Sequence, residues 1–167
     1  MPDHPARPLF DCPRRIAGRS GGGSGPESDF VLCDDLYAIH GRTEDEPAPG
    51  AVLVLSRGRV AIYRGRPDRA KDPAVGPVYS AENAPPSVPT GRAFVRFTAG
   101  TDAASRASDL AAAGYVVENV PVSAPHAAWV THRSGRIAEG LNGLRALARI
   151  PGVENVEPEL LQELARR

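Results

Sequence analysis

The sequence predicts an α+β fold, and three observations carry this prediction. Short β-branched runs recur between Asp29 and Tyr79, two segments with helical spacing follow Thr101 and Ser134, and extended runs flank those two segments. The chain also holds 17 Gly and 17 Pro among 167 residues, so turns take up a large share of it. A chain of this length accommodates one ordinary domain or two small ones.

Residues 1–28 are expected to form a disordered arm. Prolines recur through the segment, and the glycine-rich run 20–26 ends it. Too few large apolar side chains are present to offset the entropy lost on ordering the backbone.

Residues 29–82 are predicted to form a small β-rich module. The apolar run 30–33 indicates one strand, and the runs 51–55 and 60–63 around a short glycine-containing loop indicate a hairpin. A sheet of three or four strands is marginal by itself, so we expect it to pack on its neighbour. Residues 83–91 are rich in proline and predict a stiff connector to a second module.

The module over residues 92–167 begins with an alternating strand at 92–97. Thr101 is expected to cap a helix that Gly114 ends. A second strand is predicted over 115–122 and a third over 127–131.

Ser134 is expected to cap a second helix, which ends at Pro151-Gly152 and is followed by a short strand at 153–156. The apolar residues of this helix fall on one stripe: Ile137, Leu141, Leu144, Leu147 and Ile150. The order βαββαβ predicts a ferredoxin-like arrangement, with both helices on one face of a four-stranded antiparallel sheet. The other face is left open for binding, and Trp129 becomes an interface anchor if it points to that side.

Charge and composition exclude several classes of function. Lys+Arg and Asp+Glu both number 20, so nothing indicates a nucleic-acid or membrane-surface partner. No secretory signal is visible, and Cys12 and Cys33 are expected to be reduced thiols in the cytoplasm.

No enzyme chemistry is predicted. His40, His126 and His132 lack metal-ligand spacing, so no metal or other cofactor is expected. The acidic groups at 34–35 and 44–46 are interpreted as solvated loops, and no nucleophile–base pair is discernible.

The end of the chain carries a more specific pattern. An apolar helix and Pro151-Gly152 are followed by VENVEPE at 153–159, and FVRF stands at 94–97. Residues 92–160 thereby resemble the prodomain of subtilisin-like serine proteases, a propeptide-type inhibitor. The resemblance implies a non-enzymatic protein that inhibits such a protease or assists its folding in trans, since no protease domain follows in the sequence.

The resemblance also implies which residues would bind the protease. Glu157 and Glu159 would cap the N-termini of two enzyme helices, where a carboxylate is stabilised. The segment after them would lie near the active-site cleft: Leu160, Leu161, Leu164, Ala165, Arg166 and Arg167. Two alternatives stay open here, because 160–167 also fits a short amphipathic helix and because the module also fits an interaction or regulatory subunit of a larger complex.

Overall fold

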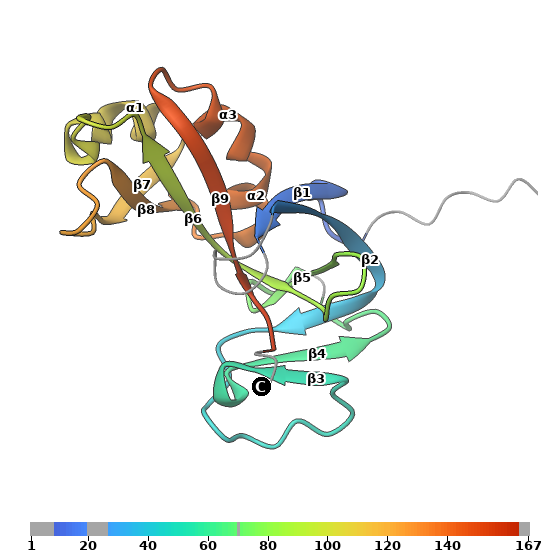
Figure 1. Cartoon of the computed structure of the whole chain (residues 1–167). Coiled ribbons are helices and arrows are strands. Elements are labelled where there is room, and N and C mark those ends of the chain that lie inside the picture. The colour runs from blue at the N-terminus through green and yellow to red at the C-terminus, as the bar shows by residue number, and fades with distance from the viewer. Residues whose placement is uncertain (1–8, 20–26, 70, 164–167) are drawn as a thin grey trace, which may run out of the picture.

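The computed structural model describes residues 9–19, 27–69 and 71–163, and its strands form two antiparallel sheets (Figure 1). In the described part of the chain, the α-helices accompany the sheet built from the C-terminal residues. The predicted α+β class is therefore confirmed in general terms.

The N-terminal sheet has the strand order β1-β2-β4-β3, and β5 also pairs with β2. Its strands are β1 (Arg15–Arg19), β2 (Glu27–Ile39), β3 (Leu53–Leu55), β4 (Val60–Arg64) and β5 (Val75–Ser80). A 3-10 turn at Ser56–Gly58 joins β3 to β4, which confirms the predicted hairpin.

The prediction of a disordered arm over 1–28 is wrong for the segment that forms β1. β1 pairs with the start of β2, and Ile16 is buried against Phe30. The hydrophobic surface that this segment lacks is supplied by Phe30 and Leu32 of β2 and, from farther along the chain, by Tyr79 and Leu141, which composition alone does not reveal. Residues 1–8 and 20–26 of the predicted arm lie outside the described residues.

The C-terminal sheet has the antiparallel strand order β7-β8-β6-β9. Its strands are β6 (Val88–Phe97), β7 (Tyr115–Asn119), β8 (Ala127–His132) and β9 (Val153–Leu161). Between β6 and β7 lie a 3-10 turn (Ala103–Arg106) and α1 (Ala107–Ala112), and between β8 and β9 lie α2 (Ile137–Asn142) and α3 (Leu144–Ala148). Strand residues such as Val95, Phe97 and Val130 form a core with Leu110 and Leu147 of the helices.

The expected helix caps differ in the structure. The carboxylate of Asp102, rather than Thr101, accepts a hydrogen bond from the backbone N–H of Ala104 at 3.1 Å. Ser134 accepts a bond from the N–H of Arg136 and lies before α2, whose start has no side-chain cap. At the first helix a second polar residue, Asp102, stands next to Thr101, and the local backbone path decides which of the two caps the turn.

The predicted second helix is broken into α2 and α3 around Gly143. Gly140 lies so close to β6 that a Cβ there would come within 2.9 Å of the Gly91 carbonyl oxygen. Gly143 lies against the ring of Tyr115, whose hydroxyl donates a hydrogen bond to the carbonyl of Gly140. Gly140 and Gly143 therefore let this segment pack closely against the sheet, and the helix is interrupted at Gly143.

The last strand is longer than the sequence predicts. β9 runs through Pro158 to Leu161, whereas the sequence places the end of the strand at 156. A proline lacks a backbone N–H, and an edge strand such as β9 tolerates it because β6 is the only strand hydrogen-bonded to it in the described sheet.

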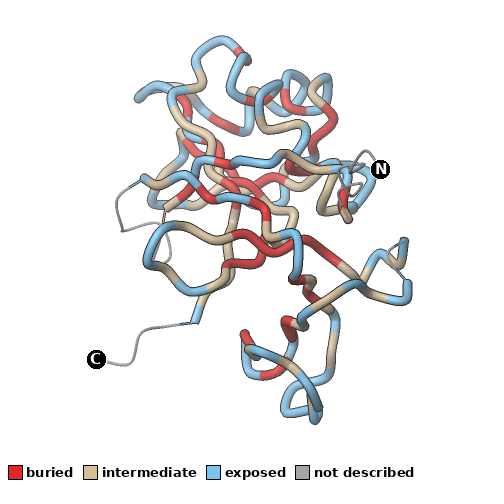
Figure 2. Tube along the Cα trace, turned by 90° about the vertical axis from the view of Figure 1, so that its right-hand side faces the viewer, coloured by how far each residue is buried: buried red, intermediate tan, exposed pale blue. Residues whose placement is uncertain are grey.

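The long strands β6 and β9 join the two sheets. Val88 pairs with Leu161, and both side chains pack in the core of the N-terminal sheet. Ser87 is buried and exchanges two backbone hydrogen bonds with Tyr79 of β5, at 2.7 and 2.9 Å. The C-terminal end of the predicted connector over 83–91 is therefore ordered, because it pairs with β5 and begins β6. Figure 2 shows buried segments gathered where the sheets meet.

No helix in the described part of the chain is long and apolar enough to span a membrane.

The close approach of α2 to β6 predicts that Gly140→Ala is destabilising. Alanine normally favours a helix, but here its methyl group meets backbone atoms that move only if the strand or helix shifts. We expect a loss of about 1–3 kcal/mol of unfolding free energy, measured by urea denaturation. Arg145→Ala, at an exposed position of α3, is the control and should stay within about 0.5 kcal/mol. A gain in stability for Gly140→Ala would contradict the packing.

A pH dependence follows from His40, whose Nε2 is buried and has no hydrogen-bond partner in the described structure. Burial lowers the pKa of His40, so the unfolded chain binds its proton at a higher pH than the native protein does. The unfolding free energy should therefore fall as the pH is lowered from 7 through the range in which the unfolded histidine titrates, about 6.5.

His40→Leu should flatten this fall, as measured by urea titrations between pH 7.5 and 5. His126→Gln, in a surface turn, is the matched control and should keep it. A profile that is the same with and without His40 would refute its role.

Candidate functional site

The face of the C-terminal sheet opposite the helices holds three of the residues that the sequence singles out for binding, Trp129, Glu157 and Glu159. Phe94 of β6 pairs with Trp129 of β8 on one side and with Glu157 of β9 on the other. Residues paired directly across a sheet share one of its faces, so these three lie together. Ala93 and Val95 alternate with Phe94 and are buried on the helix side. We call this surface the Trp129 face.

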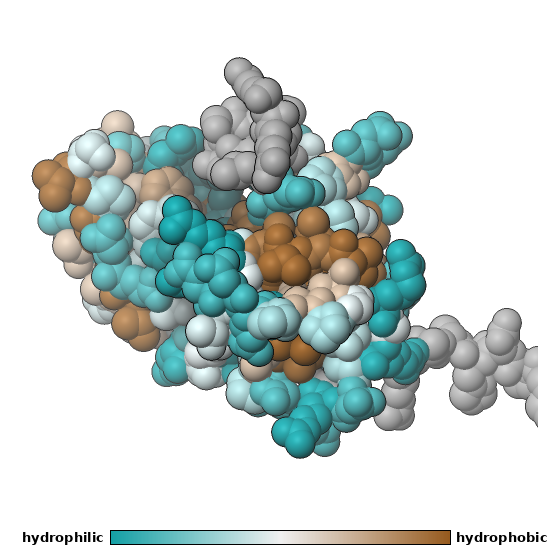
Figure 3. All heavy atoms as spheres, turned by 90° about the horizontal axis from the view of Figure 1, so that it is seen from below, coloured by the Kyte–Doolittle hydropathy of each residue, from teal (hydrophilic) through white to brown (hydrophobic). Residues whose placement is uncertain are grey.

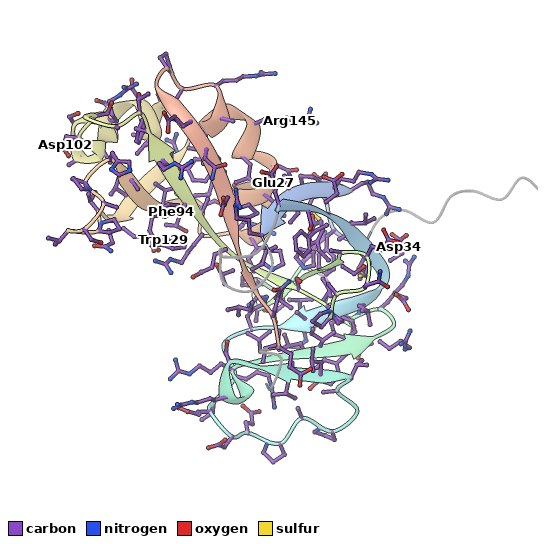
Figure 4. All side chains as sticks on the ribbon, in the orientation of Figure 1. Glu27, Asp34, Phe94, Asp102, Trp129 and Arg145 are labelled. Carbon is purple, nitrogen blue, oxygen red and sulfur yellow. The ribbon has the colours of Figure 1, made fainter. Side chains whose placement is uncertain are left out.

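An aromatic pair forms the centre of the Trp129 face. The ring centroids of Phe94 and Trp129 are 5.0 Å apart with the planes tilted by 56°. Both residues are half-buried, and Figure 4 shows their side chains close together beside β6 and β8. A large, partly exposed aromatic pair of this kind is typical of an interface anchor.

Arg92 ties the aromatic pair to the charges around it. Its guanidinium carbon lies 4.7 Å from the ring centroid of Trp129, in cation–π geometry. The same group donates to Glu118 of β7 at 2.6 Å and to Glu159 of β9 at 3.1 Å. Partial burial lowers the pKa of Arg92, but the nearby carboxylates of Glu118 and Glu159 have the larger effect, so its pKa is raised overall.

The two carboxylates expected to bind a protease are already paired within the molecule. Glu159 accepts hydrogen bonds from Arg92 and from the hydroxyl of Thr90, the latter at 2.6 Å. Glu157 accepts from Arg19 Nε at 2.8 Å and from Asn155 Nδ2 at 2.6 Å. A helix N-terminus that bound either carboxylate would have to compete with these internal partners.

The beginning of the expected cleft-binding segment has a structural role. Leu160 and Leu161 lie in β9 and pack against two different clusters of buried residues. Leu160 and Leu161 therefore belong neither to a free cleft-binding segment nor to the short amphipathic helix that the sequence also allowed. The other expected binding residues, Leu164, Ala165, Arg166 and Arg167, lie outside the described residues.

One cluster has the composition of a hydrolase site but not its geometry. Nδ1 of His132 lies 2.8 Å from the Ser134 hydroxyl and 3.5 Å from a Glu139 carboxylate oxygen. A serine–histidine–carboxylate relay needs the two ring nitrogens to face different groups, whereas both contacts here are at Nδ1. Nδ1 also accepts the backbone N–H of Ser134, so the cluster orders the turn before α2.

The remaining acidic and thiol groups that the sequence singles out do not come together in one site in the described structure. Asp34 and Asp35 lie in β2 rather than in a loop and pair with Arg14 and Arg64 on the surface. The thiols of Cys12 and Cys33 are free, and burial raises the pKa of both. Within the described ranges, no three His, Cys, Asp or Glu side chains are grouped so as to hold a metal ion.

A second apolar surface lies on the N-terminal sheet. The rings of Tyr37 and Tyr63 stack at 5.6 Å, and Val54 on the edge strand β3 is 44% exposed. Seen from below, the molecule displays apolar atoms at the end where β3 and β4 lie (Figure 3).

Sequence reasoning identifies only part of the Trp129 face. The sequence makes Trp129 an interface anchor only if its side chain points to the open face of the sheet. Its pairing with Phe94 places it on that face. Arg92 and Phe94 belong to the face by the period-two alternation of RAFVRF, a signal that the sequence does contain. Arg19 has no such signal, because its bond to Glu157 joins residues at opposite ends of the chain.

Comparison of the chain with family models, with curated proteins and with solved structures finds no match.

The internal pairing predicts that Glu157→Gln with Glu159→Gln destabilises the protein before any partner is involved. Each change removes one partly exposed ion pair, with Arg19 or Arg92, worth up to about 1 kcal/mol. We expect the double variant to lose about 1–2 kcal/mol in urea unfolding at low salt and less at high salt. Glu163→Gln, an exposed change just beyond β9, is the control. Unchanged stability at both salt concentrations would contradict the pairing.

Proposed function

We propose that the chain is a non-enzymatic protein-binding module that docks through the Trp129 face. The observation that carries the proposal is the aromatic pair Phe94–Trp129, half-buried at the centre of a sheet face without helices. A partner that covers these rings would gain apolar burial at the centre and meet a charged rim around Arg92.

We further propose that the C-terminal unit is ferredoxin-like. The strand order β9-β6-β8-β7, antiparallel throughout, supports this assignment. Helical connections between β6 and β7 and between β8 and β9 support it as well. In this arrangement the face without helices is the one available to a partner.

The proposed partner is a subtilisin-like serine protease, which the module would inhibit or help to fold in trans. Support comes from the VENVEPE ending and from Glu157 and Glu159, which flank the aromatic pair on the same face. In this proposal the cytoplasmic protein first contacts the protease through its rings. The carboxylates then exchange Arg19 and Arg92 for the N-termini of enzyme helices.

A second candidate is an interaction or regulatory subunit of a larger complex that uses the same face. The packing of Leu160 and Leu161 against two core clusters favours it, because these residues are then unavailable to enter a protease cleft. The existing pairing of both carboxylates favours it for the same reason. The two candidates share the docking face and differ in the class of partner and in the use of the tail.

Trp129→Ala should abolish most of the inhibition of a subtilisin-like protease, since a central aromatic anchor typically contributes 2 kcal/mol or more, roughly a 30-fold change in affinity. The measurement is residual activity across a panel of purified subtilisin-like enzymes, with the full chain and this variant. Val122→Ala, a fully exposed apolar residue away from the sheet, is the matched control and should inhibit as the unchanged chain does.

Three outcomes separate the candidates. Inhibition that requires Trp129 and weakens when residues 164–167 are removed supports the protease inhibitor. Inhibition that is indifferent to Trp129→Ala contradicts docking through this face. No inhibition of any enzyme in the panel contradicts the protease as partner and leaves the regulatory subunit as the proposal, to be tested by capture with and without Trp129.

A further inference from the structure

A groove of about 870 Å³ lies away from the Trp129 face, between β1, the helices α2 and α3, and the outer edge of β9. Its apolar lining includes Ile16, Leu144, Ala148, Val153 and Val156. The groove closes where Gly18 packs against Leu160 and Arg19 binds Glu157. It is therefore bounded by two strands that are distant in sequence and by the helices of the C-terminal unit.

The side of the groove formed by β9 is a strand edge. β9 ends its sheet, since β6 is its one strand neighbour in the order β7-β8-β6-β9. Four consecutive residues, 153–156, line the groove, whereas a sheet face would contribute alternate residues. Alternate backbone N–H and C=O groups of an edge strand point away from the sheet and are available to an added strand.

The opposite side of the groove is positively charged. Arg15 of β1 and Arg145 of α3 both line it and are exposed, and neither has an ion pair among the described residues. Figure 4 shows Arg145 leaving α3 on the side of β1. The other charged lining residues are already neutralised, Arg14 by Asp34 and Glu154 by Arg96 at 3.8 Å.

We propose that this groove binds a short extended peptide rich in Asp and Glu, which adds to the free edge of β9 and pairs its carboxylates with Arg15 and Arg145. Main-chain hydrogen bonds to a strand edge supply affinity without regard to sequence, and the side-chain environment supplies specificity. Here the unpaired arginines select for acidic side chains, and the apolar floor accepts the residues that alternate with them. The edge segment 153–156 matches about four to five peptide residues at roughly 3.3 Å each.

The proposal is tested with the full chain and a fluorescein-labelled hexapeptide of alternating Glu and Val, by fluorescence polarisation. We expect saturable binding that weakens as salt is raised. The same peptide with Gln in place of Glu tests the charges, and a peptide N-methylated at alternate residues tests the edge pairing. Each should bind at least about five-fold more weakly, which corresponds to roughly 1 kcal/mol.

The protein variants locate the site. Arg15→Gln with Arg145→Gln should weaken binding of the acidic peptide about ten-fold, whereas Arg149→Gln should not change it. Arg149 is an exposed arginine just after α3 that does not line the groove. Trp129→Ala should leave peptide binding intact, and the double arginine variant should leave docking through the Trp129 face intact.

Peptide binding in the groove can fail even if a partner docks on the Trp129 face, and the reverse also holds. Absence of saturable binding of the Glu–Val peptide to the full chain refutes the groove as a peptide site. Binding that is equal for the N-methylated peptide refutes pairing to β9. Binding that is unaffected in the double arginine variant, or lost in Trp129→Ala, assigns the peptide to another surface.

Discussion

The pairing of β6 with β9 is the interaction on which the rest of the structure depends. Over one part of their length these strands form the centre and edge of the C-terminal sheet, with Val95 in its helix-covered core. At the other end Val88 and Leu161 pack in the core of the N-terminal sheet. Each sheet is small, and a shared pair of strands lets each stabilise the other.

The same pairing places the functional candidates. It sets Glu157 beside Phe94, and the neighbouring β6–β8 register sets Trp129 on the other side of that ring. The carboxylates of Glu157 and Glu159 are thereby held by Arg19 and Arg92. A docking partner would meet a preorganised face, at the cost of exchanging ion pairs that the free protein already makes.

The molecule presents two surfaces of different chemistry on its C-terminal unit. The Trp129 face offers aromatic rings within a charged rim, which suits a folded partner with a complementary flat surface. The groove between β1 and β9 offers a strand edge and unpaired arginines, which suits an extended acidic segment. β9 contributes residues to both surfaces, Glu157 and Glu159 to the Trp129 face and the segment 153–156 to the groove.

The sequence by itself determined the elements of the C-terminal unit. The alternation of RAFVRF, the apolar stripe from Ile137 to Ile150 and the stop at Gly114 are local patterns, and local patterns predict strands and helices. Only the tertiary structure decided that residues 15–19 form a strand, that the second helix breaks around Gly143, and that Leu160 and Leu161 are structural. These features depend on Tyr79, Tyr115 and Val88, partners distant in sequence whose contacts no local spacing encodes.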